Sequence, residues 1–246
     1  MAMMALGWGL VAGSAAFLGA ILGWFSRPTA ETVGLLLAFA SGILLAIAAF
    51  ELFDDAFSTG GFAPAAVGLL AGAALFAGGL GLLDRRGAGK RKLSPTHTIE
   101  AREPARVVAM ATVLEAIPEA LIIGIAFYAE EDVGLAAVIA VFLSNVPESL
   151  ATTARMRAIG RSAAYVAAVW GSVALATGLA ALAGYLALGD LHPAGRAFAQ
   201  ALAGGAFLAF IANSMLPAAF ADARNRAGFV LVVGFLTGYA LSHFVA

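Results

Sequence analysis

Long, unbroken apolar runs rich in Ala, Leu and Gly fill most of this chain. A membrane-spanning helix needs about 20 consecutive apolar residues, whereas membrane β-strands show shorter segments of alternating polarity. Of the 246 residues, 62% are hydrophobic and only 12% are charged. So few charges do not cover a water-facing surface, which excludes a soluble globular protein. The runs therefore predict an all-α, polytopic membrane protein.

The apolar runs divide the chain into eight predicted transmembrane helices, which form a single transmembrane domain over residues 1–246. Their approximate limits are residues 3–25, 33–57, 62–83, 105–129, 133–154, 163–188, 196–221 and 229–246. Residues 84–104 form the only long polar connection between them. The Gly, Pro and charge content of this connection predicts a loop without a packed core.

Basic residues predict how the chain is oriented in the membrane. Every Lys and Arg except Arg196 lies in or beside an odd-numbered connection between the predicted helices. Cytoplasmic loops collect Lys and Arg, so we predict a cell-membrane protein with both termini outside and the 84–104 loop in the cytoplasm. The formal net charge of −1 gives no indication of a nucleic-acid partner.

Four glutamates lie inside the predicted spans, where ionisable groups are costly and usually functional. Glu51 is in the second span, Glu115 and Glu119 in the fourth, and Glu148 in the fifth. The four-residue spacing of Glu115 and Glu119 puts both carboxylates on one helix face. Ser144 and Asn145 share a face with Glu148 for the same reason. No Lys or Arg lies at matching depth, so these carboxylates are either partly protonated or hold a cation.

The fourth and fifth predicted spans share the pattern L-x-x-[apolar]-P-E-x-L, at residues 114–121 and 143–150. Pro118 and Pro147 each free the carbonyl four residues earlier, and such a group must find a partner inside the bundle. Carboxylates and freed carbonyls together predict an oxygen-lined cation site between the two spans. The alternative is that both prolines are merely tolerated and the glutamates are protonated and hydrogen-bonded.

Other polar residues are candidates for a pathway through the protein. Asp54 and Asp55 end the second predicted span, where they either concentrate cations or are simply solvated. Glu51 is either a pathway residue or a carboxyl bonded to a neighbouring helix. Pro217 predicts a third kink, preceded by Asn213 and Ser214, and these two polar residues are alternatively hydrogen-bonding groups between helices.

The Pro-Glu segments resemble those of the ZIP (Zrt/Irt-like) family of divalent metal transporters, as do the eight spans and the long loop after the third. The family patterns are roughly H-[NS]-x-P-E-G and [HQ]-[ND]-x-P-E-G, where this chain has EAIPEA at 115–120 and SNVPES at 144–149. The family's H-E-x-x-P-E in the seventh span corresponds to NSMLPA at 213–218. The resemblance implies that Glu119, Asn145 and Glu148 are metal ligands. Glu115 occupies a ligand position that usually holds His in the family. Ser144 occupies a position that usually holds His or Gln.

As a function, the resemblance implies import of divalent cations into the cytoplasm by alternating access, with zinc, iron, manganese or cadmium as cargo and no other cofactor. It also implies that the first, fourth, fifth and sixth spans move against a scaffold of the other four, often at a homodimer contact. The absence of histidine ligands favours harder ions. The alternatives are a proton-linked carrier that uses the same glutamates and a non-transporting scaffold. An intramembrane metalloprotease would require H-E-x-x-H, which is absent, so we expect no enzyme.

Overall fold

The computed structural model describes residues 2–26, 28–83, 116–117, 119–125, 127–128, 131–188 and 191–244. The described elements are all helices, and no strand occurs among these residues. The elements are α1 (Ala2–Phe25), α2 (Ala30–Ile47), the π-helical η1 (Ala48–Phe53), α3 (Asp54–Gly60), α4 (Phe62–Leu83), α6 (Glu131–Ala158), α7 (Ala163–Leu188), α8 (Pro193–Phe210), the π-helical η3 (Ile211–Met215), α9 (Leu216–Ala223) and α10 (Asn225–Phe244). The helical residues described between 116 and 128 are called the 116–128 segment below.

Six helices are long and apolar enough to cross a membrane, among the residues that the structure describes. They are Ala2–Phe25, Ala30–Gly60, Phe62–Leu82, Ala163–Ala187, Pro193–Ala223 and Asn225–Phe244. These match the first three and last three predicted spans, so the prediction of helices long and apolar enough to cross a membrane is confirmed there. The fifth predicted span lies within α6, whose 28 residues extend about 42 Å. Most of the fourth span and the 84–104 loop lie outside the described residues, so the count of eight stays a prediction.

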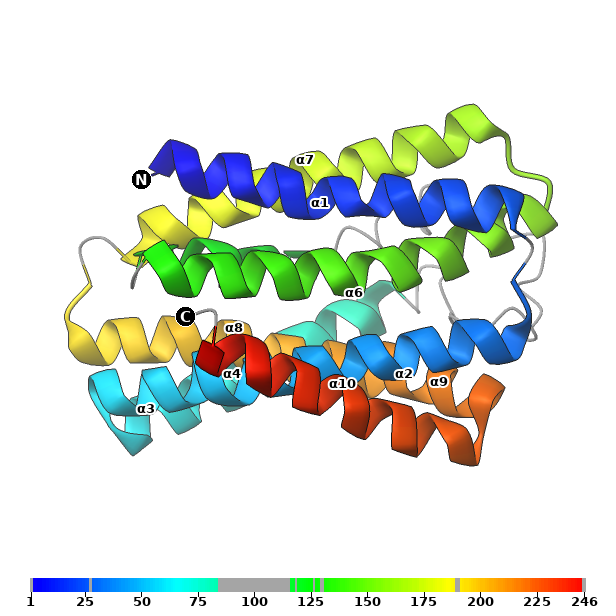
Figure 1. Ribbon diagram of the computed structural model, residues 1–246. Helices are drawn as coiled ribbons and strands as arrows, with labels where there is room; N and C mark the ends of the chain where they lie inside the picture. The colour runs from blue at the N-terminus through cyan, green and yellow to red at the C-terminus, as the bar shows by residue number, and fades with distance from the viewer. Residues whose placement is uncertain are drawn as a thin grey trace.

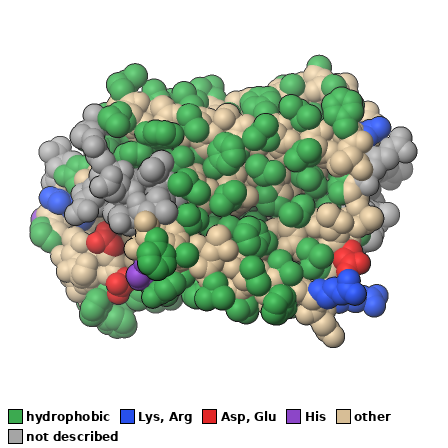
Figure 2. Space-filling view, in the orientation of Figure 1, with side chains coloured by type: hydrophobic (Ala, Val, Ile, Leu, Met, Phe, Trp, Pro, Cys, Tyr) green, Lys and Arg blue, Asp and Glu red, His purple; other side chains and the backbone are tan. Residues whose placement is uncertain are grey.

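The surface of the bundle is apolar along its middle. In Figure 2, hydrophobic side chains cover the central part of the visible face, whereas Lys, Arg, Asp and Glu appear near its two ends. Exposed large hydrophobic residues include Leu70, Leu75, Phe229 and Leu236. The helices run roughly along one direction, and α1 begins at the same end of the bundle where α10 finishes (Figure 1). This arrangement fits a membrane protein whose termini share one side, and which side that is stays a prediction.

The helices pack in two groups. The first helix group consists of α1, α6, α7 and the 116–128 segment, which share two clusters of buried hydrophobic side chains. The second helix group consists of α2, η1, α3, α4, α8, η3, α9 and α10. Figure 1 shows α1 and α7 on the opposite side of α6 from α4, α8 and α10. The two groups meet where α6 contacts α2 and α10, and residues of α6 and of the 116–128 segment belong to the core cluster of the second group.

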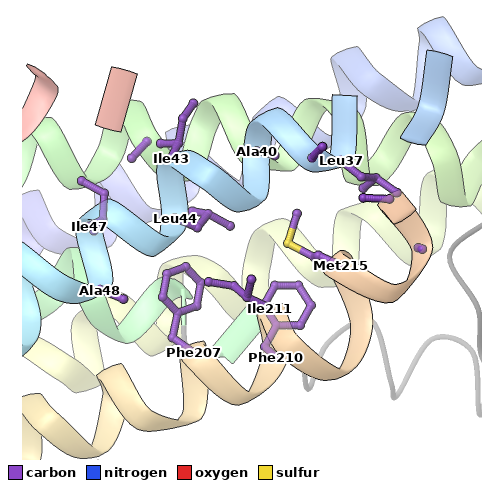
Figure 3. Close-up of a cluster of buried hydrophobic side chains, with 14 of the residues drawn as sticks. Leu37, Ala40, Ile43, Leu44, Ile47, Ala48, Phe207, Phe210, Ile211 and Met215 are labelled. Carbon is purple, nitrogen blue, oxygen red and sulfur yellow. The ribbon is translucent and has the colours of Figure 1, made fainter. Parts of the chain in front are cut away.

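Glycines set the closest helix contacts inside each group. A Cβ on Gly19 of α1 would lie 2.0 Å from Ser149 Oγ on α6, and one on Gly42 of α2 would lie 2.1 Å from the Leu231 carbonyl oxygen on α10. Only a residue without a side chain permits such an approach, and small residues are how membrane helices pack closely. The second group is further held by a core between α2 and α8–η3, in which Leu44, Phe207 and their neighbours interdigitate (Figure 3).

An internal repeat relates α1–α4 to α7–α10. Thr29 and His192 each cap the following helix by accepting a hydrogen bond from the backbone N–H three residues on. The π-helical segments η1 and η3 begin at equivalent positions, and each long helix then ends at a linking residue with positive φ, Gly61 (85°) or Arg224 (49°). In each of these three pairs, the second residue follows the first by the same number of positions in the sequence. In space α2 packs on α10 and α4 packs on α8, so each half of the repeat completes the other.

Candidate functional site

Most of the buried polar side chains in the described part of the chain lie on one stretch of α6. They are Ser144, Asn145, Glu148, Ser149, Thr152 and Thr153. Glu148 is 5% exposed, and Glu119 on the 116–128 segment is 1% exposed. Both glutamates predicted to be functional are therefore inside the bundle. Buried carboxyl groups surrounded by apolar helices are energetically costly, so their presence needs a chemical reason.

The two elements that carry these carboxyl groups pack against each other. Ile123 and Phe127 of the 116–128 segment form one hydrophobic cluster with Val138 and Val141 of α6. Ile122 of this segment and Ala140, Leu150 and Ala151 of α6 also belong to the large core cluster formed mainly by α2 and α8–η3. Glu119 lies one helical turn before Ile122 and Ile123, and Glu148 lies just before Leu150. The packing thus brings together the two predicted Pro-Glu segments.

Asn145 ties α6 to α1. Its Nδ2 donates a hydrogen bond of 3.2 Å to the Ala12 carbonyl oxygen across the helix interface. This bond engages only the amide nitrogen, and the amide oxygen of an Asn is an acceptor that can ligate a cation. The Ser144 hydroxyl similarly donates to the Val141 carbonyl, at 2.9 Å, and its oxygen lone pairs are still able to accept. Both side chains thus donate to protein carbonyls, and their oxygen atoms are acceptors.

Pro147 and Pro217 lie in different structural environments. Pro147 is buried in α6, and the helix continues through it from Glu131 to Ala158. Because Pro147 has no N–H, the Leu143 carbonyl lacks its usual partner in the helix. Pro217 is exposed near the start of α9, directly after η3. Glu115 and Pro118 lie outside the described residues.

The polar pair before Pro217 lies on η3. Asn213 is exposed, and its Nδ2 donates to the Ala209 carbonyl oxygen of the preceding turn, at 2.7 Å. Ser214 is half-buried on the same π-helical segment. The amino-acid sequence did not predict this π-helix, a form of helix that is rare overall and frequent at functional sites.

The acidic residues of the second predicted span lie in the second helix group. Glu51, on η1, accepts a hydrogen bond of 2.9 Å from the Ser242 hydroxyl of α10 through Oε1. This contact matches the alternative of a carboxyl bonded to a neighbouring helix. Asp55 accepts a hydrogen bond from the buried Gln200 of α8, whereas Asp54 is exposed. Sequence reasoning missed Gln200, because a lone Gln in an apolar helix has no distinctive spacing.

The described residues contain no group of three or more His, Cys, Asp and Glu side chains that could hold a metal ion. A cation bound at Glu119 and Glu148 would therefore need hydroxyl, amide or carbonyl oxygens, or a carboxylate from outside the described residues. Ser144, Asn145 and the Leu143 carbonyl are candidates of this kind. No protein-family model matches the chain, and no curated protein matches it.

Proposed function

We propose that this chain is a divalent metal cation transporter of the ZIP type, which moves ions toward the cytoplasm by alternating access. The proposal rests on the burial of Glu119 and Glu148 on two elements of an apolar helical bundle that share a hydrophobic cluster. Ser144 and Asn145 supply neutral oxygens beside Glu148 on α6. The cell membrane is the proposed location, with both termini outside.

The buried carboxyl groups support a cationic substrate. Glu119 and Glu148 are both buried in the apolar bundle. Carboxylate oxygens are the protein ligands that hard divalent cations prefer. Oxygen-only ligand sets suit manganese and magnesium better than zinc. Manganese is therefore the first metal to test, followed by iron, zinc and cadmium.

The two helix groups support a mechanism in which the site moves as a unit. The first group corresponds to the spans that the family resemblance assigns to the moving part, and the second group to the scaffold. Polar ties join helices within a group: Arg157 of α6 donates to the Trp24 carbonyl of α1, and Arg226 at the start of α10 pairs with Glu31 of α2. Such ties let each group keep its internal packing while the two groups shift.

Metal-dependent thermal stabilisation and proteoliposome uptake test this proposal. Purified protein is melted with manganese, iron, zinc or cadmium, and the same ions are offered for uptake with and without a proton gradient. We expect at least one ion to raise the melting temperature and to enter the vesicles. Proton flux without metal stabilisation would favour the proton-linked carrier instead. The absence of both signals would favour a non-transporting scaffold.

A further inference from the structure

Buried hydroxyl groups in this bundle normally have a hydrogen-bond partner. Ser41 donates to the Leu37 carbonyl at 2.7 Å, and Thr177 donates to the Val173 carbonyl at 2.9 Å, each within its own helix. Thr153 accepts a bond of 2.8 Å from the Trp170 indole nitrogen. Thr152 differs: it is 5% exposed, and its Oγ1 has no hydrogen bond. It is the one buried Ser or Thr of the described residues with this property.

The missing bond at Thr152 is a costly arrangement. A Thr inside a helix can satisfy its hydroxyl by donating to the carbonyl four residues earlier, which for Thr152 is the carbonyl of Glu148. A buried polar group left without a partner loses the hydrogen bonds that it would make to water. Such a group in a folded protein calls for an explanation, such as a bound water or ion.

The position of Thr152 suggests which ligand it serves. Ser144, Glu148 and Thr152 are spaced at intervals of four residues, so they follow one another on the same face of α6. Each step along this line rises about 6 Å. From Glu148, this line of residues runs toward the end of α6 at Ala158. That end carries Arg157, and we predict that it faces the cytoplasm.

We propose that the Thr152 hydroxyl is a cation ligand, which forms a second position for the divalent ion one helical turn beyond Glu148. The inference rests on the proposed transport function and adds a direction to it. A neutral hydroxyl holds a metal ion more weakly than a carboxylate does. An ion shared between Glu148 and Thr152 is therefore on its way out of the carboxylate site, toward the end of α6 at Ala158.

The test compares Thr152→Val with Thr152→Ser and with Thr177→Val. Valine keeps the shape and removes the hydroxyl, and serine restores it. Thr177 is an equally buried control whose hydroxyl is satisfied by its own helix. Binding of Mn²⁺ to the purified full-length protein is measured by titration calorimetry, and uptake is measured in proteoliposomes. We expect Thr152→Val to weaken Mn²⁺ binding about tenfold, and Thr152→Ser and Thr177→Val to bind like the original chain.

The melting temperature without metal separates a ligand from a structural group. Removing an unsatisfied buried hydroxyl does not cost a hydrogen bond, so Thr152→Val melts at or above the temperature of the original protein. A lower melting temperature than that of Thr177→Val, or unchanged Mn²⁺ binding, would overturn the assignment of Thr152. If Glu148→Gln loses Mn²⁺ binding while Thr152→Val does not, only this inference fails. If the original protein binds none of manganese, iron, zinc and cadmium, both this inference and the proposed function fail.

Discussion

The guanidinium of Arg196 lies over the ring of Tyr128, with 5.5 Å between its Cζ and the ring centroid. Arg196 belongs to α8 of the second helix group, and Tyr128 to the 116–128 segment of the first. Tyr128 also packs against the hydrophobic cluster of Ile125 and Ala203, and its ring meets Tyr185 of α7 edge-on, with 5.6 Å between the ring centroids. The contact thus joins the two groups at the end of the bundle where α8 begins.

We expect Arg196→Ala to loosen this end of the bundle, because a cation–π contact contributes about 0.5–1 kcal/mol or more when partly desolvated. The chain contains no Cys, so a single Leu121→Cys reports on opening through its labelling rate with a maleimide. Labelling should be faster in the Arg196→Ala background. Arg161→Ala is the matched control, because Arg161 lies over Tyr165 at 5.3 Å near the start of α7. Equal rates in both backgrounds would show that Arg196 does not hold the groups together.

Gly19 should be intolerant of any side chain. A Cβ there would lie 2.0 Å from Ser149 Oγ and 2.1 Å from the Val146 carbonyl oxygen on α6. Gly19→Ala must therefore push α1 away from α6, and overpacking of this kind costs about 1–3 kcal/mol. Thermal melting in detergent measures the loss. Gly78→Ala on α4 serves as the control, since a Cβ there meets nothing within 4 Å. Equal melting temperatures for the two variants would contradict the close packing of α1 and α6.

The Thr153–Trp170 hydrogen bond should stabilise the first helix group without taking part in transport. Thr153→Val leaves the Trp170 indole N–H buried without an acceptor, which costs about 1–3 kcal/mol. Thr153→Ser keeps the acceptor and should restore most of the stability. We expect uptake per folded molecule to be unchanged in both variants, as measured by proteoliposome assays normalised to folded protein. A selective loss of uptake in a fully stable Thr153→Val would place Thr153 in the transport path.

Glu115 provides a test of the metal preference, although it lies outside the described residues. The family resemblance places His at this position, and imidazole favours zinc over harder ions. Glu115→His should therefore shift competition in an uptake assay from manganese toward zinc. Glu31→Gln, at an exposed ion pair on α2, is the carboxylate control and should leave the preference unchanged. An unchanged preference in Glu115→His would argue against a ligand at this position.

The apolar pattern predicts the helices well, and its errors have local causes. The predicted helices at 62–83 and 163–188 coincide with α4 and α7. Two other helices begin three residues earlier than predicted, at Ala30 and Pro193, because Thr29 and His192 cap them ahead of the apolar run. Caps of this kind depend on one side chain and not on hydropathy.

The internal repeat and its π-helical segments were not foreseen. The α2 and α8 sequences differ at most positions, and η1 (AAFELF) and η3 (IANSM) have no sequence pattern in common. The insertion of one extra residue into a helical turn therefore leaves no trace in the hydropathy pattern.

For the candidate site, the energetic cost of a carboxyl group inside a membrane was enough to identify Glu119 and Glu148 as candidate functional residues. Both side chains are buried in the structure. Thr152 was missed because a Thr in an apolar helix usually bonds to its own backbone. Only the three-dimensional structure reveals that this hydroxyl does not. Likewise, the position of Asn213 before Pro217 made it a candidate pathway residue, and only the structure shows that its side chain is exposed.

The proposed carboxylate site for a transported cation is tested most directly by Mn²⁺ uptake into proteoliposomes that contain the original chain, Glu148→Gln or Glu31→Gln. Glutamine preserves the size of Glu148 and removes its charge, so the bundle should still fold. We predict saturable Mn²⁺ uptake by the original chain and by Glu31→Gln, and no uptake above empty vesicles by folded Glu148→Gln. Uptake by Glu148→Gln at the rate of the original chain would contradict a carboxylate site for the transported ion.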